Sequence, residues 1–214
     1  MKLYTYFRSS AAYRVRIALH LKGLAFESVP VHLLRDGGQQ HAPAYAALNP
    51  NQTVPTLDDE GLILTQSLAI IEYLDELHPT PPLLPGTAAD RARIRAIAQT
   101  IACDIHPINN LRVLQYLESR LGHGEAEKTA WYCHWVERGL RAVETLLAGD
   151  PCTGRFCHGD TPTLADCCLV PQVFNARRFG CSLAGLDTIV RICTACEALP
   201  AFERAAPQHQ PDAQ

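Results

Sequence analysis

The chain has 214 residues, of which 47% are hydrophobic, so it can bury a substantial core as one large domain or two smaller ones. Its formal net charge at neutral pH is -3, and the absence of a basic run argues against nucleic acid as a partner. The longest apolar runs are too short to span a membrane, and we expect neither a membrane segment nor a secretory leader.

Nine cysteines are present. An odd number without a secretory signal favours free thiols in a reducing compartment, so we expect a cytoplasmic location. Cys193 and Cys196 have the spacing of half a zinc ribbon, but the sequence holds no second pair of this kind. We therefore predict no metal site and interpret the cysteines as small apolar core residues.

The first 80 residues change periodicity repeatedly, which predicts an α/β domain. Residues 3–7 predict a strand, and helical spacing follows through 14–23, where Gly23 can end the helix. Residues 26–34 predict a second strand, and this βαβ order favours a parallel pair. The remaining predicted elements are a short helix at 43–48, a hairpin of strands at 53–58 and 62–65, and an amphipathic helix at 67–77.

Residues 79–85 contain four prolines, which is typical of a linker. The sequence after it has helical periodicity throughout, and Pro107 should kink the first long segment. The expected helices are at 88–121, 125–147, 163–179 and 186–199. Two domains are therefore predicted, an α/β domain at 1–80 and an all-helical domain at 86–214.

Ser9 and Ser10 stand where the first predicted strand passes directly into a helix. The start of a helix exposes unpaired N–H groups and the positive end of the helix dipole. A serine at this position can cap the helix or can hydrogen-bond an anion that lies above it. Ser67, which follows Gln66 at the start of another predicted helix, has the same two interpretations.

Val54-Pro55 lies at the front of the predicted hairpin. It is either an edge strand with a trans bond or a cis peptide that exposes the N–H and C=O of Val54 to an extended ligand. Thr163 and Asp166 have the spacing of a capping box, which we interpret as structural.

Basic and polar residues mark two further places in the helical half. Arg177 and Arg178 lie near the end of a predicted helix, where they can interact with its dipole or hold a carboxylate. His106, beside Pro107, belongs to a polar segment that is either a surface face or the lining of a cleft.

Together these segments resemble the cytosolic glutathione transferases, and most closely their zeta class. The class signature Ser-Ser-Cys-x-Trp-Arg-Val-Arg appears at residues 9–16 as Ser-Ser-Ala-Ala-Tyr-Arg-Val-Arg. The other matching stretches are 36–40, 48–50, 54–55, 66–74, 106–112, 159–166 and 169–179. Because Ala11 replaces the signature cysteine, the chemistry needs no protein thiol at this position. His106 replaces a usual glutamine and can also titrate.

The resemblance implies the glutathione transferase fold, which is an α+β thioredoxin-like domain followed by an all-α domain. It implies glutathione as cofactor, a homodimer, and cis–trans isomerisation of maleylacetoacetate to fumarylacetoacetate in aromatic catabolism. The alternatives are isomerisation of maleylpyruvate and glutathione transfer, including dehalogenation of α-halo acids. A non-catalytic binding protein of the same fold is the alternative outside the enzymes.

The resemblance also suggests roles for particular residues. Ser9 is expected to hydrogen-bond the glutathione thiolate, with Ser10 as the alternative. Arg8 and Arg178 are the candidates for holding the substrate carboxylate and the enolate formed on addition. The glutathione contacts carried over by motif are Gln40, the Val54 backbone, Gln66, Ser67, His106, Asn110 and Arg112.

Overall fold

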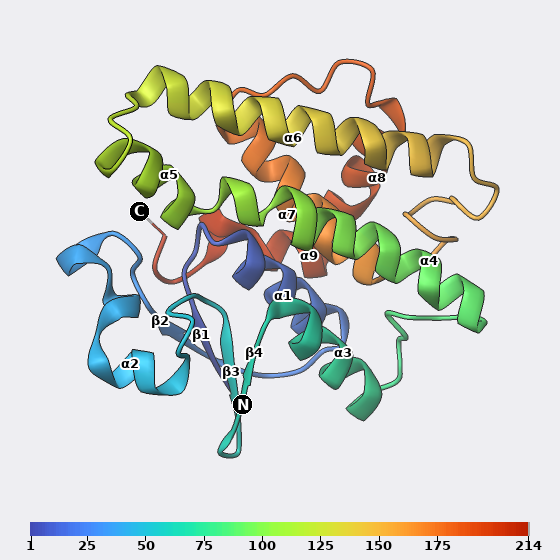
Figure 1. The fold of residues 1–214 in the computed structure, drawn as a ribbon. Helices are drawn as coiled ribbons and strands as arrows, with labels where there is room; N and C mark the ends of the chain where they lie inside the picture. The colour runs from blue at the N-terminus through green and yellow to red at the C-terminus, as the bar shows by residue number, and fades with distance from the viewer. Residues whose placement is uncertain (214) are drawn as a thin grey trace. The chain divides into compact units, whose positions relative to one another are not determined.

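A computed structural model describes residues 1–213 of the chain, which form two compact units (Figure 1). One unit comprises Met1–Leu83 together with the residues from Glu197 onward, and the other comprises Leu84–Cys196. This differs from the predicted division at 1–80 and 86–214, because the C-terminal residues pack with the N-terminal unit. Among the described residues, no helix combines the length and apolar character that a membrane span requires.

The N-terminal unit is built on a four-stranded mixed sheet with strand order β2-β1-β3-β4. β1 pairs in parallel with β2 and antiparallel with β3, and β3 pairs antiparallel with β4, so the predicted βαβ unit and hairpin are confirmed. The elements are β1 (Lys2–Thr5), α1 (Ser10–Leu21), β2 (Glu27–Pro30), α2 (Pro43–Leu48), β3 (Thr56–Asp59), β4 (Leu62–Thr65), α3 (Ser67–Leu77) and α9 (Pro200–Ala205).

The second strand is shorter than predicted. Alternation suggested a strand over 26–34, but β2 ends at Pro30, which has no N–H group to donate to a neighbouring strand. Helix α1 begins at Ser10, four residues before the predicted start, because Ser9 caps it. The helix ends in a turn where Gly23 has a φ of +65°, as its position at the end of the helical pattern predicted.

A fully buried arginine joins α1 to both ends of the chain. Arg16 donates through Nη2 to the carbonyl of Phe7 (3.0 Å), through Nη1 to Thr5 Oγ1 (3.0 Å), and through Nε to the carbonyl of Ala205 in α9 (3.0 Å). Burial lowers the pKa of Arg16 to about 10. α9 lies beside α1 (Figure 1), which is the physical reason that the C-terminal segment belongs to this unit.

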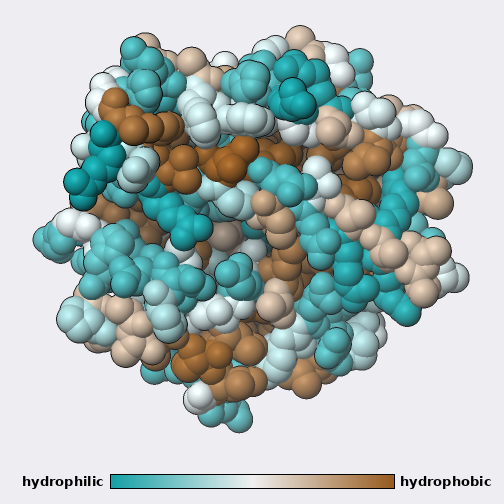
Figure 2. All heavy atoms as spheres, in the orientation of Figure 1, coloured by the Kyte–Doolittle hydropathy of each residue, from teal (hydrophilic) through white to brown (hydrophobic). Residues whose placement is uncertain are grey.

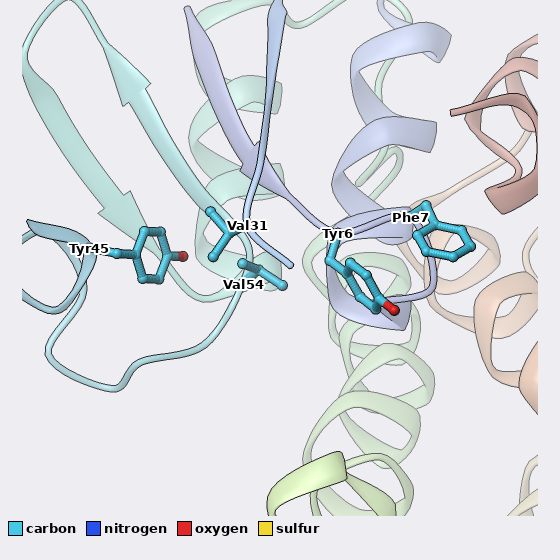
Figure 3. Close-up of a cluster of buried hydrophobic side chains, with 5 residues drawn as sticks. All are labelled: Tyr6, Phe7, Val31, Tyr45 and Val54. Carbon is cyan, nitrogen blue, oxygen red and sulfur yellow. The ribbon is translucent and has the colours of Figure 1, made fainter. Parts of the chain in front are cut away.

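A cluster of apolar side chains packs around the loop that follows β1 (Figure 3). Tyr6 and Phe7 from this loop lie edge to face, with ring centroids 4.9 Å apart. Val31, Tyr45 and Val54 complete the cluster. Because these residues come from four different segments, the cluster fixes the path of the loop relative to α2 and the start of β3.

The second unit is helical. The segment expected as one long kinked helix at 88–121 is interrupted twice, by a π-helical stretch at Thr100–Ile105 and by a break at Pro107, so the predicted kink is confirmed but the continuous helix is wrong. Pro107 lacks the N–H group that would continue the helix. The helices are α4 (Ala88–Gln99), α5 (Leu111–Ser119), α6 (Glu125–Ala148), α7 (Leu164–Arg178) and α8 (Asp187–Glu197).

The start of α7 has the predicted capping box. Asp166 Oδ2 accepts the N–H of Thr163 (2.7 Å) and its hydroxyl (2.8 Å), while Oδ1 accepts the N–H of Cys157 (2.8 Å). Burial raises the pKa of Asp166, because desolvation outweighs these hydrogen bonds. The box therefore also anchors the loop before α7, a structural role.

Replacing Arg16 should destabilise the N-terminal unit. Arg16→Leu leaves the carbonyls of Phe7 and Ala205 buried without a donor, so the free energy of unfolding should fall by about 3 kcal/mol. Arg35, whose side chain is exposed, provides the control, and Arg35→Leu should change stability by less than about 0.5 kcal/mol. Urea unfolding measures both, and equal midpoints for the two variants would contradict the role of Arg16.

Candidate active site

Ser9 is the N-cap of α1. Its backbone is extended (φ −71°, ψ 117°), its N–H donates to the carbonyl of Tyr6 (2.9 Å), and its Oγ accepts the N–H of Ala12 (3.2 Å). The capping interpretation of this residue is thus confirmed. Capping uses Ser9 Oγ only as an acceptor. The hydroxyl proton stays available to donate a hydrogen bond to another acceptor.

The start of α1 has the chemistry of an anion site. Ser9 is half-buried, while Ser10 is 4% exposed. The first N–H groups of a helix have no acceptor within the helix, and its dipole favours negative charge here. Arg8 precedes this point and is exposed, with its guanidinium carbon 4.8 Å from the centroid of the Phe7 ring. The hydrogen bond from Ser9 to a ligand anion, with Ser10 as the alternative donor, stays a prediction.

Gln66 and Ser67 form a second helix start in the same unit. Gln66 is exposed and has a φ of +69°, a left-handed conformation that is rare outside glycine. The predicted capping role of Ser67 is wrong, because Ser67 is the first residue of α3 and its buried Oγ accepts a hydrogen bond from Arg14 Nη1 (3.2 Å). Strained backbone of this kind clusters at functional sites, which supports Gln66 as a ligand contact.

Val54 and Gln40 complete the predicted residues of this unit. The Val54-Pro55 bond is cis, so of the two predicted alternatives the cis peptide is confirmed and the trans bond is wrong. Gln40 is 6% exposed, and its Nε2 lies 3.1 Å from His41 Nε2. Its Oε1 is buried and accepts no hydrogen bond from the part of the chain that the structure describes. A buried acceptor without a donor is costly, so this atom is suited to an N–H group of a ligand.

Three predicted site residues of the helical unit, His106, Asn110 and Arg112, lie close together in the sequence near Pro107. The ring Nε2 of His106 lies 3.3 Å from Asn110 Nδ2. Asn110 caps α5 by accepting the N–H of Arg112 through Oδ1 (3.3 Å), and Arg112 itself is exposed. A π-helical stretch precedes His106, and such insertions are frequent at functional sites. The contacts give Asn110 a structural role beside any role toward a ligand.

Arg177 and Arg178 are both exposed in the last turn of α7, as the dipole interpretation requires. The guanidinium carbon of Arg178 lies 4.6 Å from the centroid of the Phe179 ring. Phe179 in turn stacks on Tyr132 of α6, with ring centroids 3.8 Å apart. Burial raises the pKa of Tyr132. Arg178 is thus positioned by an aromatic pair.

Comparison with known proteins bears on both units. Residues 3–82 match the family model "Glutathione S-transferase, N-terminal domain", and residues 136–204 match "Glutathione S-transferase, C-terminal domain". The chain belongs to the glutathione S-transferase family. It is 52% identical to the probable maleylacetoacetate isomerase of Vibrio cholerae, with 99% of this chain and 97% of the relative covered.

Two solved structures place this glutathione S-transferase more finely. One is a holo structure of maleyl pyruvate isomerase, a bacterial glutathione S-transferase in the zeta class (51% identity, TM-score 0.97, all of both chains covered). The other is maleylacetoacetate isomerase from Methylobacterium extorquens AM1 with bound malonate and glutathione (43% identity, TM-score 0.96, all of both chains covered). The resemblance to the zeta class and the predicted fold class are thus confirmed.

Arg14, Arg16 and Asp212 support the predicted site of this family member, although no pattern in the sequence marks them as site residues. Arg16 holds the carbonyls of the loop before Ser9, and Asp212 Oδ2 accepts the N–H of Phe7 in the same loop (3.0 Å). Arg14 reaches Ser67. The sequence does show that two arginines interrupt the apolar face of α1, which indicates buried hydrogen-bond partners. It does not identify these partners, because they lie far away along the chain.

The predicted site residues are divided between the two units. Those of the N-terminal unit are Arg8, Ser9, Ser10, Gln40, Val54, Gln66 and Ser67, and those of the helical unit are His106, Asn110, Arg112 and Arg178. Each set is organised by contacts within its own unit. A joint role for the two sets stays a prediction.

One cluster in the helical unit has the composition of a metal site. Asp90, Cys152 and His158 each place one potential ligand atom within 4.8 Å of the others. The guanidinium of Arg93 lies beside this cluster, with Nη1 3.3 Å from His158 Nδ1, and Asp90 Oδ2 already accepts the N–H and the hydroxyl of Thr87. Because a fixed positive charge this close disfavours a second cation, we assign no metal to the cluster, and the expected absence of a metal stays a prediction.

Proposed function

We propose that this protein is a glutathione-dependent cis–trans isomerase that converts maleylacetoacetate to fumarylacetoacetate. The observation that carries the proposal is the capped start of α1, where Ser9 keeps a hydroxyl proton beside the positive end of a helix. The identity of 52% to a probable maleylacetoacetate isomerase supports the substrate. Maleylpyruvate is the alternative, because the holo structure of maleyl pyruvate isomerase is similarly close and both substrates share the maleyl group.

The described residues fit glutathione, a peptide with a thiol, amide N–H groups and two carboxylates. The buried Oε1 of Gln40 lacks a donor and suits an amide N–H. The backbone of Val54 can pair with an extended peptide, and the start of α3 at Gln66 and Ser67 suits a carboxylate. His106, Asn110 and Arg112 are the contacts that we propose from the helical unit.

Rotation about the double bond of a maleyl ketoacid is slow unless that bond becomes single for a time. Bound glutathione supplies a thiolate that adds reversibly to the conjugated alkene and is regenerated. The protein must therefore favour the thiolate, orient the ketoacid, and stabilise the charge that develops on the ketone oxygen. Arg8 and Arg178 carry the positive charge that we assign to the last two tasks.

The thiolate requires a modest stabilisation. A free thiol has a pKa of about 8.5, and lowering it by roughly two requires about 2.7 kcal/mol of preferential stabilisation of the anion. A charge-assisted hydrogen bond of roughly 1.5–3 kcal/mol and a helix dipole contribution of about 0.3–1 kcal/mol together supply this amount. We assign the hydrogen bond to Ser9, with Ser10 as the alternative.

An assay of both ketoacids with a catalytic amount of glutathione tests the function. We expect the cis isomer to disappear and the trans isomer to form while the glutathione concentration stays constant, with the higher kcat/KM for maleylacetoacetate. A higher value for maleylpyruvate would reassign the substrate. Glutathione consumed in proportion to product would indicate transfer or dehalogenation, and absence of turnover with either ketoacid would refute the isomerase.

Replacement of Ser9 should weaken the thiolate. In Ser9→Ala the pKa of bound glutathione should rise by about one to two, because one charge-assisted hydrogen bond is lost. Ultraviolet absorbance of the thiolate against pH measures this midpoint. Ser10→Ala is the matched control, and an unchanged midpoint in Ser9→Ala with a raised one in Ser10→Ala would transfer the role to Ser10.

The two arginines should act on the ketoacid. A net charge of -3 provides no overall attraction for a dianionic substrate, so local cations must bind it. Arg8→Ala and Arg178→Ala should each lower kcat/KM by at least about tenfold, or about 1.4 kcal/mol, with little change in glutathione affinity. Arg177, the exposed neighbour on α7, is the control. A comparable loss in Arg177→Ala, or none in the other two, would contradict the assignment.

We also propose a homodimer. Among the described residues, the large apolar side chains that stay exposed are Leu34, Leu62, Leu77, Tyr116, Leu121 and Leu146. On the face drawn in Figure 2, apolar side chains gather in patches between polar ones, and exposed apolar patches can mark a protein–protein interface. Sedimentation at micromolar concentration should give twice the 23.5 kDa of one chain. A mass near that of one chain would refute the dimer.

A further inference from the structure

Two free thiols of the helical unit lie in direct contact. Cys133 lies on α6 and Cys181 follows the end of α7, 48 residues later, and their Sγ atoms are 2.9 Å apart. This separation is only about 0.9 Å longer than a disulfide bond. Cys133 Sγ also lies 3.6 Å from the carbonyl of Phe179. Neither thiol takes part in the chemistry proposed above.

The end of α7 fixes the position of Cys181. Gly180 has a φ of +70°, its N–H donates to the carbonyl of Arg177 (3.1 Å), and the N–H of Cys181 donates to the carbonyl of Ala176 (2.9 Å). This pair of hydrogen bonds is a Schellman motif, in which a left-handed residue reverses the chain after the last helical turn. Cys181 is therefore held by backbone hydrogen bonds, and its side chain is 7% exposed.

Contacts from α6 hold the same turn on both sides of the sulfur pair. The ring of Tyr132 stacks on Phe179, with ring centroids 3.8 Å apart. Glu137 Oε1, one helical turn after Cys133, accepts the N–H of Ser182 (2.9 Å). Because independent contacts hold the residues before and after Cys181 against α6, the approach of the two sulfur atoms does not depend on a single mobile side chain.

We propose that Cys133 and Cys181 are a redox modification site that forms a reversible intramolecular disulfide with a small disulfide oxidant such as glutathione disulfide. Cys133 is half-buried and is the thiol that such an oxidant can reach. Burial and the hydrogen bond from Cys133 raise the pKa of Cys181, which makes it the second thiol to react.

The exchange is balanced in two steps. The thiolate of Cys133 attacks one sulfur of glutathione disulfide, the oxidant's S–S bond breaks, and one glutathione leaves with the bonding electron pair. Cys181, as its thiolate, then attacks the Cys133 sulfur of this mixed disulfide and expels the second glutathione. The two thiol protons end on the two glutathione molecules, so the protein loses two electrons and the oxidant gains them.

The crosslink would join α6 to the turn that carries Phe179, directly after Arg178. Cys103 and Cys152 are exposed free thiols outside this pair. Each can therefore react with glutathione disulfide to form a mixed disulfide with glutathione. Replacing both by serine removes this background reaction without touching the proposed pair.

The test uses the Cys103→Ser, Cys152→Ser protein in glutathione buffers with a rising share of glutathione disulfide. After acid quenching and alkylation under denaturing conditions, the oxidised protein should carry two alkyl groups fewer than the reduced protein, and proteolysis should release one crosslinked peptide that contains Cys133 and Cys181. Alkylation of both thiols should fall roughly tenfold and recover with dithiothreitol.

Two controls decide the result. The same protein with Cys133→Ser should form no crosslink, whereas Cys193→Ser, which changes another buried thiol, should leave it unchanged. Accumulation of a stable glutathione adduct on Cys133 with Cys181 still free would overturn the proposal. So would full alkylation of both thiols in glutathione disulfide alone, or a crosslink to any other cysteine.

Discussion

The buried guanidinium of Arg16 is the interaction on which the N-terminal unit depends. Removing a charge from water is costly unless its hydrogen bonds are replaced, and Arg16 replaces them with Thr5 Oγ1 and the carbonyls of the loop after β1 and of α9. Burial lowers its pKa to about 10, so it stays charged at neutral pH. One side chain thus requires the strand end, the loop and the C-terminal segment to meet at a single point.

This requirement places the proposed thiolate site on a rigid support. The carbonyls of Tyr6 and Phe7 accept from Arg16, and the N–H of Phe7 donates to Asp212, so the loop before Ser9 is held from both sides. A donor that must stabilise charge contributes most when its position is fixed before the reaction. The sequence-distant C-terminal residues therefore support the site without being part of it.

Helix α7 of the other unit is also held by hydrogen bonds to buried or turn residues. A capping box holds its first turn and a Schellman motif holds its last turn. At its start, Asp166 accepts N–H groups from Thr163 and Cys157, and at its end the Schellman turn at Gly180 lies against α6. These two anchors orient the last turn, which carries Arg178. The same turn positions the Cys133–Cys181 pair, so the proposed oxidation would act on a segment that is already well ordered.

The sequence by itself determined the local elements: α2 and α3 have their predicted bounds, the βαβ unit is parallel, Pro107 breaks its helix, and Ser9 caps α1. These features follow from periodicity, proline and capping chemistry, which act over a few residues. Only the tertiary structure decided that Arg16 reaches Ala205, that Asp212 reaches Phe7, and that Ser67 meets Arg14 instead of capping α3. The partners of a buried polar group are chosen by how distant segments pack, and no local pattern records that choice.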